Sequence, residues 1–241
     1  MRVALIGYGK MGKIIGKLLL ERNHRISFTI DQENQPEIHN ILPDNTDICI
    51  EFTGPDSAFE NLSILIKNKL PVVCGSTGWY DRMEQIRELV IQHDTSFVAA
   101  SNFSIGVNLF FEAAQNLATI MKNHLNYNVS INETHHTEKL DAPSGTAITL
   151  SEEVRKVMDR YTGYSLNEKV SDDQIPVFAF REENVPGTHE LTFKDEIDEI
   201  TLRHVAFNRT GFALGAVVAA EYIVDKKGVF TIREILKLLN H

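Results

Sequence analysis

The sequence has 241 residues, of which 43% are hydrophobic and 24% charged, as expected of a soluble globular protein with one large or two modest domains. Its formal net charge of −9 comes without a compensating basic run and argues against a nucleic-acid or anionic-membrane partner. The longest apolar stretch, residues 212–224, contains Gly215 and Glu221 and is shorter than the roughly 18 residues of a membrane span. Cys49 and Cys74 lie in apolar runs and form no C-x-x-C, and no signal peptide precedes the first strand, so we expect reduced thiols and a cytoplasmic protein.

The N-terminal segment predicts a dinucleotide-binding unit. A short apolar strand, residues 2–6, leads into a glycine-rich turn and then into an amphipathic helix. A G-x-G-x-x-G turn alone is weak evidence, but this one separates a strand from a helix, and Asp31 ends the next strand, residues 26–30. Glycines allow the backbone to approach a pyrophosphate at the helix N-terminus, and Asp31 can bind a ribose hydroxyl. The alternative is an ordinary strand-to-helix turn.

Strands and helices continue to alternate up to residue 100. Strands are predicted at residues 47–52, 71–74 and 96–100, with amphipathic helices between them. Such alternation predicts a parallel sheet whose ligands bind beyond the carboxyl ends of the strands. Three turns at that edge consist of small polar residues, and we expect them to line one cleft with the glycine loop: Thr53-Gly54, Gly75-Ser76-Thr77-Gly78 and Ser101-Asn102-Phe103-Ser104.

The pattern changes after residue 105 and predicts a second, α+β domain with a mixed or antiparallel sheet. A long helix and a strand precede a histidine-containing loop, a helix that starts at Ser144 and a polar stretch, residues 162–174. Three further strands follow, joined by hairpin-like turns at Pro186-Gly187 and residues 195–198. Two helices interrupted at Gly228 end the chain. The expected ranges after residue 105 are helices at 107–125, 209–227 and 231–239 and strands at 127–134, 175–181, 189–194 and 199–207.

Residues 133–146, Glu-Thr-His-His-Thr-Glu-Lys-Leu-Asp-Ala-Pro-Ser-Gly-Thr, are the strongest candidate for chemistry. Histidine titrates near neutral pH and lysine is positively charged, so His135, His136 and Lys139 offer proton donors and an anion anchor. Ser144, preceded by proline, is the expected N-cap, and the unpaired N–H groups of its helix can bind a carboxylate or phosphate. A solvated loop with chance histidines is the alternative. We expect no metal, because no second ligand cluster is recognisable nearby and the lysine would repel a cation.

The run from His135 to Ala147, His-His-x-x-Lys-x-Asp-x-Pro-Ser-Gly-Thr-Ala, closely resembles the motif of the dihydrodipicolinate reductases of lysine and diaminopimelate biosynthesis. The resemblance extends over nearly the whole chain. It implies a Rossmann-type parallel sheet domain of residues 1–104 and 209–241, which binds the dinucleotide, and a substrate-binding and tetramerisation domain of residues 105–208. It also implies a cytoplasmic homotetramer without metal that reduces a small dicarboxylate, 4-hydroxy-tetrahydrodipicolinate, to tetrahydrodipicolinate with NADH or NADPH and loss of water.

The resemblance further implies the roles of individual residues. His135 and Lys139 match the acid–base pair of the family. The substrate contacts match His136, Lys139, Ser144, Gly145 and Thr146. The cofactor contacts match Gly7, Tyr8, Gly9, Lys10, Met11, Gly12, Asp31, Gly75, Ser76, Thr77, Ala100, Ser101, Asn102 and Phe103.

Two features of the cofactor half depart from the family pattern. The glycine loop is one residue shorter than the usual G-x-x-G-x-M-G, which affects how the pyrophosphate fits. Gln32 follows Asp31 at a position where members that use NADPH often have an arginine. The 2′-phosphate of NADPH would therefore meet a carboxylate, with only Lys10 and Lys13 nearby, and we expect NADH to be preferred or at least equal.

Two other functions fit part of the sequence. Another two-domain dehydrogenase of a small amino acid would share the first hundred residues but would not explain the run from His135 to Thr146. A redox-sensing module that binds a dinucleotide and assembles through its second domain would need the half from Gly7 to Asp31. Such a sensor has no use for a proton donor beside an anion-binding helix start.

Overall fold

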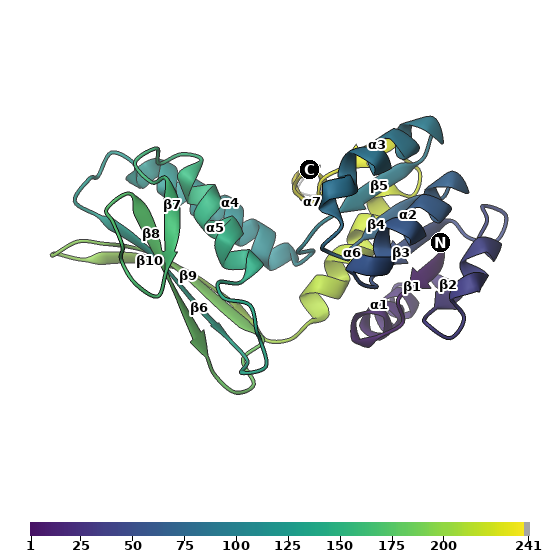
Figure 1. Cartoon of the computed structure of the whole chain (residues 1–241), viewed down its shortest axis with the longest axis horizontal. Helices are drawn as coiled ribbons and strands as arrows, with labels where there is room; N and C mark the ends of the chain where they lie inside the picture. The colour runs from purple at the N-terminus through teal and green to yellow at the C-terminus, as the bar shows by residue number, and fades with distance from the viewer. Residues whose placement is uncertain (239–241) are drawn as a thin grey trace. The chain divides into compact units, whose positions relative to one another are not determined.

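The chain folds into two compact units, each with its own sheet and its own hydrophobic core (Figure 1). The computed structural model describes residues 1–238, with side chains up to Lys237. The first unit combines Met1–Ile105 with the chain from Thr210 onward, and the second comprises Gly106–Arg209. The first unit is therefore built from both ends of the chain.

The first unit is a parallel six-stranded sheet with helices on both faces, as the alternating pattern predicts. The strand order is β11-β5-β4-β3-β1-β2, and all neighbouring strands are parallel. The strands are β1 (Arg2–Ile6), β2 (Arg25–Ile30), β3 (Ile48–Glu51), β4 (Val72–Cys74), β5 (Ser96–Ala99) and β11 (Gly228–Phe230). The helices are α1 (Lys10–Glu21), α2 (Pro55–Lys67), α3 (Met83–Gln92), α6 (Thr210–Ile223) and α7 (Ile232–Leu238), with the 3₁₀ turns η1 (Gln35–Asn40) and η2 (Tyr80–Arg82).

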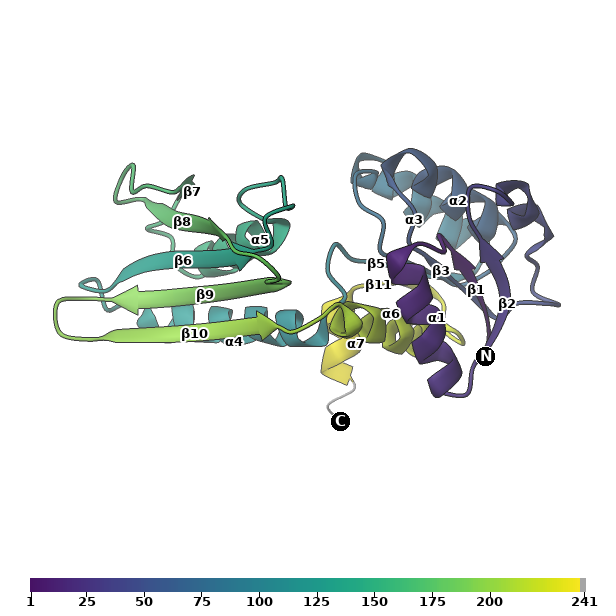
Figure 2. The ribbon, with the colours of Figure 1, turned by 90° about the horizontal axis from the view of Figure 1, so that it is seen from below.

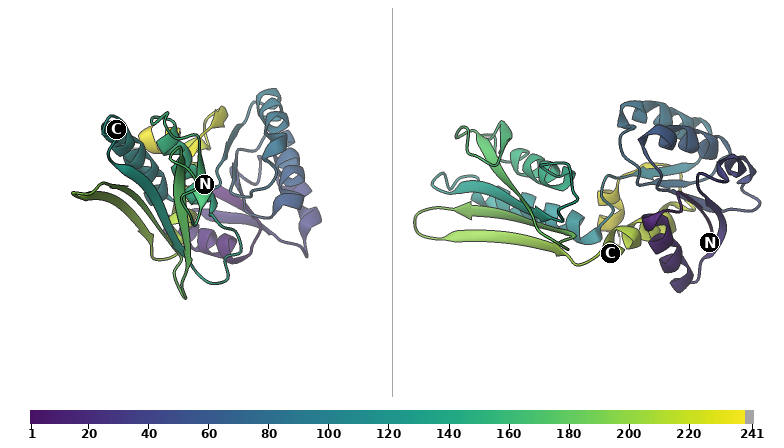
Figure 3. Two further views of the ribbon diagram at one scale, coloured as in Figure 1. Left: turned by 60° about the vertical axis from the view of Figure 1, so that its left-hand side comes forward. Right: turned by 60° about the horizontal axis from the view of Figure 1, so that its bottom comes forward.

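Alternation along the strands divides this unit into two core layers. In β1, Val3 and Leu5 pack in the layer that includes α1, α6 and α7, while Ala4 and Ile6 pack in the layer that includes α2 and α3. The right-hand view of Figure 3 shows helices on both sides of the sheet. Strands buried on both faces are mostly apolar, which is why β1, β3 and β4 are short apolar runs rather than alternating sequences, apart from Arg2 at the start of β1 and the buried Glu51 at the end of β3.

The second unit is a mixed five-stranded sheet in the order β10-β9-β6-β8-β7 (Figure 2). The pairs β6–β8 and β7–β8 are parallel, and β6–β9 and β9–β10 are antiparallel. The two helices of this unit pack in one core with β6, β8 and β9, so both cover the same face of the sheet. The strands are β6 (Asn128–His135), β7 (Gly163–Leu166), β8 (Gln174–Arg181), β9 (Gly187–Lys194) and β10 (Glu199–Ala206), and the helices are α4 (Ile105–Met121) and α5 (Gly145–Arg155).

Several expectations about this architecture are wrong in detail. The polar stretch 162–174 contains β7, a short strand at the edge of the sheet. β8 and β9 do not form a hairpin at Pro186-Gly187, because β6 lies between them; β9 and β10 are true neighbours. Gly228 separates the last two helices, as expected, and has a φ of +107°. It also begins β11, a strand that the sequence did not indicate.

The predicted helices 107–125 and 209–227 both end earlier, at Met121 and Ile223. The last predicted helix, 231–239, corresponds to α7, and its final residue lies outside the described residues. Among residues 1–238, no helix combines the length and the apolar character needed to cross a membrane.

Candidate active site

The glycine loop of the first domain brings the chain's backbone close to the end of β3. Gly7 has a φ of +92°, and a Cβ atom there would lie 2.1 Å from the carbonyl oxygen of Phe52. A Cβ atom at Gly12 would lie 2.1 Å from the carbonyl oxygen of Gly7. Gly9 caps α1 without a side chain, and the first turn of that helix carries no acidic residue. The unpaired N–H groups at this helix start are therefore suited to a phosphate, despite the shortened loop.

A cavity of about 730 Å³ lies beside this loop. Asp31 at the end of β2 lines it, and its carboxylate accepts a 2.9 Å hydrogen bond from the Glu33 N–H. The cavity thus joins the start of the glycine loop with the acidic residue expected to bind ribose. Its lining residues are Ile6, Gly7, Tyr8, Gly9, Ile30, Asp31, Gln32, Glu33, Gln35, Phe52, Thr53, Gly54, Asp56, Ser57 and Asn61.

The polar turns follow neighbouring strands, as expected, because β3, β4 and β5 are consecutive in the sheet. The Thr53 N–H donates a 2.8 Å hydrogen bond to the Ser76 hydroxyl. Glu51, fully buried, accepts hydrogen bonds from the Thr53 hydroxyl and, at 3.2 Å, from the Cys74 thiol. A Cβ atom at Gly75 would lie 2.2 Å from the Phe52 ring. The turns after β3 and β4 are therefore held together by a buried polar network.

The predicted cofactor residues differ in exposure. Lys10, Thr77 and Ser101 are exposed, and Met11, Ala100 and Asn102 are partly buried. Gly12, Ser76 and Phe103 are buried, and Phe103 packs in the core that includes α6. Gly75, Ser76, Thr77 and residues 100–103 do not line the 730 Å³ cavity.

In the second domain, β6 carries Glu133 and His135 on its buried face. Val129, Ile131, Glu133 and His135 alternate with more exposed residues, so the face is apolar at the start of the strand and polar at its carboxyl end. His135 is the last residue of β6 and not part of a loop, because its carbonyl accepts a 2.9 Å hydrogen bond from Glu182 N–H beyond β8. His189 lies directly opposite Glu133 on β9.

Glu133 connects this strand to the start of α5. Its side chain is fully buried, and its Oε1 accepts a 2.9 Å hydrogen bond from the Ser144 N–H. Its Oε2 accepts a hydrogen bond from the Ser144 hydroxyl. The same hydroxyl accepts the Ala147 N–H at 3.2 Å, which confirms Ser144 as the N-cap of α5. The buried Ser144 is thereby committed to Glu133 and to its own helix.

Two histidines flank the Glu133 carboxylate. Its Oε2 lies 3.6 Å from His135 Nδ1 and 3.7 Å from His189 Nε2, and the two imidazole rings pack edge to face with centroids 5.0 Å apart. Burial, followed by the neighbouring charge of His189, lowers the pKa of His135 from 6.5 to about 4. Hydrogen bonds from His189 and Ser144 outweigh burial and lower the pKa of Glu133 to about 2. This cluster therefore combines a stable carboxylate with an imidazole that is neutral at pH 7.

Lys139 and Arg181 place positive charge next to this cluster. Lys139 Nζ lies 2.8 Å from both Asp141 carboxylate oxygens, which lowers the pKa of Asp141. Arg181 on β8 donates hydrogen bonds to the carbonyls of Lys139 and Asp141 at 3.1 and 2.7 Å, and its Nη1 lies 4.0 Å from Glu133 Oε1. Arg181 thus holds the loop that carries the lysine.

Of the remaining predicted substrate residues, Gly145 and Thr146 begin α5 and His136 directly follows β6. Gly145 is exposed, and no atom lies within 4 Å of where its Cβ would be. Thr146 is partly buried. His136 is partly buried, and its carbonyl accepts a 3.1 Å hydrogen bond from the Lys139 N–H. The structure therefore brings His135, His136 and Lys139 onto one short segment, and the Glu133 contact joins that segment to the helix start.

Glu133, His135 and His189 also satisfy a simple distance criterion for a metal site, since their ligand atoms lie within 4.8 Å of one another. The expectation that no cluster of ligands lies near the histidines is thus wrong, because β9 supplies His189. However, both carboxylate oxygens accept hydrogen bonds from Ser144, and Arg181 lies beside them. These contacts favour a hydrogen-bonded acid–base cluster over a cation site.

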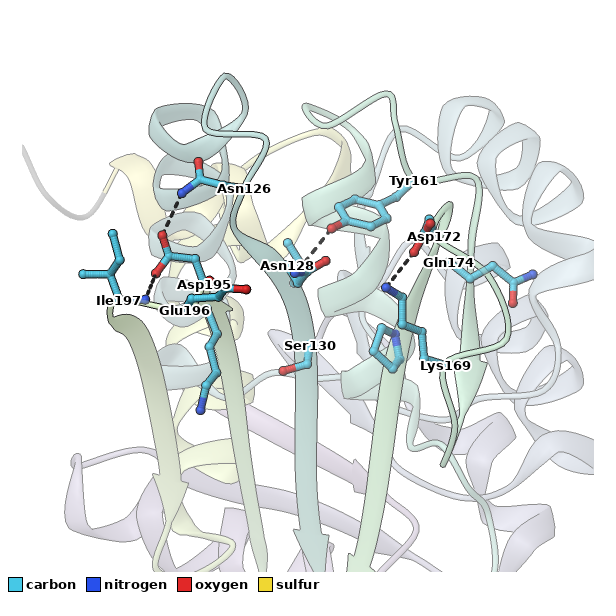
Figure 4. Close-up of a pocket in the computed structure, with 13 residues that line it drawn as sticks. Asn126, Asn128, Ser130, Tyr161, Lys169, Asp172, Gln174, Asp195, Glu196 and Ile197 are labelled. Carbon is cyan, nitrogen blue, oxygen red and sulfur yellow. Dashed lines mark hydrogen bonds and ion pairs between the residues drawn. The ribbon is translucent and has the colours of Figure 1, made fainter.

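A second cavity, of about 720 Å³, lies at the opposite end of β6 from His135 (Figure 4). Several of its charged residues have partners: Lys169 pairs with Asp172 at 2.6 Å, Lys194 pairs with Glu199 at 3.2 Å, and Asp195 accepts a 2.7 Å hydrogen bond from the Asn126 amide. The Tyr161 hydroxyl accepts the Val129 N–H at 3.2 Å. None of the predicted site residues lines this cavity.

Glu133, Arg181 and His189 were not assigned functions from the sequence. The spacing of Glu133 and His135 on a strand could have indicated a shared face. His189 and Arg181 carry no such local signal, because only the pairing of β9 and β8 with β6 brings them to the cluster.

The chain matches two family models over most of its length. Residues 1–103 match the description "Dihydrodipicolinate reductase, N-terminus", and residues 106–236 match "Dihydrodipicolinate reductase, C-terminus". The chain is 46% identical, over 236 residues, to the 4-hydroxy-tetrahydrodipicolinate reductase of Christiangramia forsetii, and the alignment covers 98% of each protein.

Solved structures agree with the fold. The dihydrodipicolinate reductase of Paenisporosarcina sp. TG-14, solved with dipicolinate bound, superposes with a TM-score of 0.81 at 24% identity, covering 98% of this chain and 99% of that one. A probable dehydrogenase of Thermotoga maritima superposes with a TM-score of 0.58 at 11% identity, covering 99% and 93%. These two similarities concern the fold alone.

Proposed function

The chain belongs to the dihydrodipicolinate reductase family, and on that premise we propose that it reduces 4-hydroxy-tetrahydrodipicolinate to tetrahydrodipicolinate with loss of water. The reaction is a step of lysine and diaminopimelate biosynthesis, and the reductant is a nicotinamide dinucleotide. The observation that carries the proposal is the contact of Glu133 with both Ser144 and His135, because it joins a proton-transfer group to an anion-binding helix start.

The dinucleotide fits the first domain. The start of α1 would hold the pyrophosphate, and Asp31 would hold a ribose hydroxyl, with Gly7, Tyr8 and Gly9 beside them. Lys10, Met11 and Gly12 would complete the loop, and the turns 75–77 and 100–103 would border the nicotinamide end. When bound, the nicotinamide supplies the hydride.

The substrate carboxylate would bind at the start of α5. The Gly145 and Thr146 N–H groups, the Thr146 hydroxyl, His136 and Lys139 would hold it and orient the ring. The Ser144 hydroxyl already donates to Glu133, so Ser144 would act by fixing the helix start rather than by touching the substrate.

Proton transfer is assigned to His135 and Lys139. Hydride addition to the conjugated imine that remains after water loss leaves electron density on the ring, and one proton must follow. Lys139 carries such a proton, and His135 can deliver one once it is protonated in the complex. A dicarboxylate next to these groups favours their protonated forms.

We propose that NADH is preferred or used as well as NADPH. Asp31, Glu33 and Asp56 all line the cavity that would hold the adenosine ribose, and Gln32 adds no charge. The 2′-phosphate of NADPH would lie among these carboxylates, with Lys10 as the nearby compensating charge.

We propose a cytoplasmic homotetramer assembled through the second domain. The helices of that domain cover one face of its sheet, and Phe180, which alternates with the core residues Ile175 and Val177, is 51% exposed on the other. Cys49 and Cys74 are buried free thiols, which suits a reducing compartment. The tetramer is tested by light scattering at micromolar concentration, where a monomer would contradict the assignment.

The decisive experiment is an absorbance assay of NADH oxidation with freshly made product of the preceding synthase. We expect oxidation that requires both synthase and its substrates, and its loss in the His135→Gln variant. Absence of turnover with either NADH or NADPH, from a protein that binds the dinucleotide, would favour the redox sensor instead.

A further inference from the structure

Glu133 is a buried carboxylate to which the reductase family motif, starting at His135, assigns no role. Its side chain is fully buried at the polar end of the β6 core face. Burying a charge is unfavourable unless hydrogen bonds and opposite charges compensate it. Here Ser144 donates two hydrogen bonds, and His135, His189 and Arg181 lie within 4.0 Å.

The Ser144 contacts fix where α5 begins. The N–H and hydroxyl of Ser144 both point to Glu133, and the hydroxyl also caps the helix through Ala147. The N–H groups of Gly145 and Thr146, which follow directly, take their position from this anchor. The geometry of the proposed carboxylate site therefore depends on Glu133.

The charges around His135 come from four elements. Lys139 follows β6, Arg181 is on β8 and His189 is on β9; a positive charge on any of them opposes protonation of the imidazole. Among the groups that act on His135, Glu133, on β6 itself, favours protonation, and its Oε2 lies 3.6 Å from Nδ1. Contacts of this kind are often long in the free enzyme and shorten when substrate binds.

We propose, as an extension of the proposed reductase function, that Glu133 is a positioning residue that joins the two parts of the substrate site. It fixes the start of α5 for the substrate carboxylate, and it places a permanent negative charge beside His135 so that the imidazole holds a proton in the complex. His189 holds the carboxylate from the other side, across the β6–β9 pair.

Glu133→Gln tests the charge, because glutamine keeps the shape of the side chain and can still accept a hydrogen bond from Ser144. In this variant His135 would lose the carboxylate that favours its protonation, while His189, Lys139 and Arg181, which oppose it, would remain. We expect kcat to fall about tenfold or more. The apparent pKa above which kcat declines should be lower than in the wild type by about one unit or more. The Kd of dipicolinate should change less than about threefold. Glutamine still accepts a hydrogen bond from Ser144, and removing a nearby negative charge does not weaken the binding of an anion.

Ser144→Ala tests the anchor, because it removes the hydroxyl and keeps the charge of Glu133. We expect weaker dipicolinate binding and an unchanged pH dependence of kcat. Glu153→Gln is the matched control: Glu153 is another buried acid of this domain, on α5, paired with Lys156 at 2.6 Å. It should leave the pH profile and the Kd of dipicolinate unchanged.

A pH profile in Glu133→Gln that matches the wild type would overturn the proposal. The same downward shift in Glu153→Gln would also overturn it. So would a Glu133→Gln variant that loses dipicolinate affinity and melting temperature but keeps the wild-type pH profile, because Glu133 would then be only a structural residue. If Glu133→Gln does not fold, calorimetry of dipicolinate binding to the wild type in buffers of different ionisation enthalpy decides: proton uptake supports the proposal, and none overturns it. Wild-type protein that fails to oxidise NADH with the synthase product contradicts the proposed function, not the role of Glu133.

Discussion

The backbone N–H of Thr53 and the hydroxyl of Ser76 form a 2.8 Å hydrogen bond that joins the turns after β3 and β4. Ser76 is buried, so its side chain supports the neighbouring turn from within the protein. Thr53 also lines the cavity beside the glycine loop. A substitution at Ser76 should therefore affect cofactor binding indirectly, by shifting the position of Thr53.

Cofactor choice follows from the charges at the end of β2. We expect kcat/KM with NADH to equal or exceed that with NADPH, because Asp31 and Glu33 line the ribose cavity. Gln32→Arg should raise kcat/KM for NADPH about tenfold, the effect of about 1.4 kcal/mol, with Gln35→Arg in the same cavity as a comparison. A wild-type ratio of about tenfold in favour of NADPH would contradict this prediction.

The acid–base assignment predicts a loss of turnover without loss of cofactor binding. His135→Gln and Lys139→Ala should each lower kcat by about 10² to 10⁴, the usual contribution of general acid catalysis. The Kd of NADH, measured by fluorescence, should stay near the wild-type value, because both residues belong to the second domain. A variant that retains more than half of the wild-type kcat would show that its residue is not a proton donor.

The helix start of α5 predicts a site for planar dicarboxylates. We expect dipicolinate to bind and to compete with substrate. Thr146→Val should weaken it roughly ten- to a hundredfold, because a hydrogen bond to a charged group contributes about 1.5–3 kcal/mol. Thr149→Val, one turn further along α5, is the matched control and should bind normally. Calorimetry that detects no binding to the wild type at millimolar concentration would remove the carboxylate site.

The second domain should lose stability as the pH falls. Unfolded histidine takes up a proton near pH 6.5, but His135 in the fold does so only near its pKa of about 4, so stability falls between these values. Glu133, whose pKa is about 2 instead of 4.5, extends the loss below pH 4.5. Each unit of pKa difference corresponds to about 1.4 kcal/mol. In thermal melts between pH 7 and 4, His135→Gln should lose less stability than the wild type, and equal losses would refute this.

Gly215 predicts a steric effect on stability. A Cβ atom there would lie 1.7 Å from the carbonyl oxygen of Phe103, so α6 passes the turn after β5 in direct backbone contact. Gly215→Ala should destabilise the first domain towards the upper end of the roughly 1–3 kcal/mol typical of overpacking. At Gly211 on the same helix, the added atom would lie 3.5 Å from the Ser104 hydroxyl, so Gly211→Ala should be neutral or slightly stabilising. Denaturant unfolding of both variants would compare them directly.

Local chemistry explains what the sequence predicts well. The glycine turn, Asp31 and the Ser144 cap each depend on a few consecutive residues, and the structure has them where the sequence predicts a strand end or a helix start. The alternating strands and helices likewise predict the parallel sheet, because short crossovers leave few arrangements.

The features that the sequence did not predict depend on pairing between strands far apart in the chain. The position of β6 between β8 and β9 depends on register across the whole domain, so neither the false hairpin at Pro186-Gly187 nor the proximity of His189 to Glu133 follows from local sequence. The strands β7 and β11 are short and lie at sheet edges, where a polar or glycine-containing segment gives little pattern to recognise.

The pairing of β11 with β5 has a consequence for how the protein is made. Gly228–Phe230 completes the first sheet next to Ser96–Ala99, but the entire second domain is synthesised between these two strands. While the chain is still growing on the ribosome, the edge of β5 therefore remains unpaired, and the apolar surface that α6 will cover stays open. The second domain can fold as soon as its own residues have emerged, so it should mature first, although its sequence comes later than that of the first sheet.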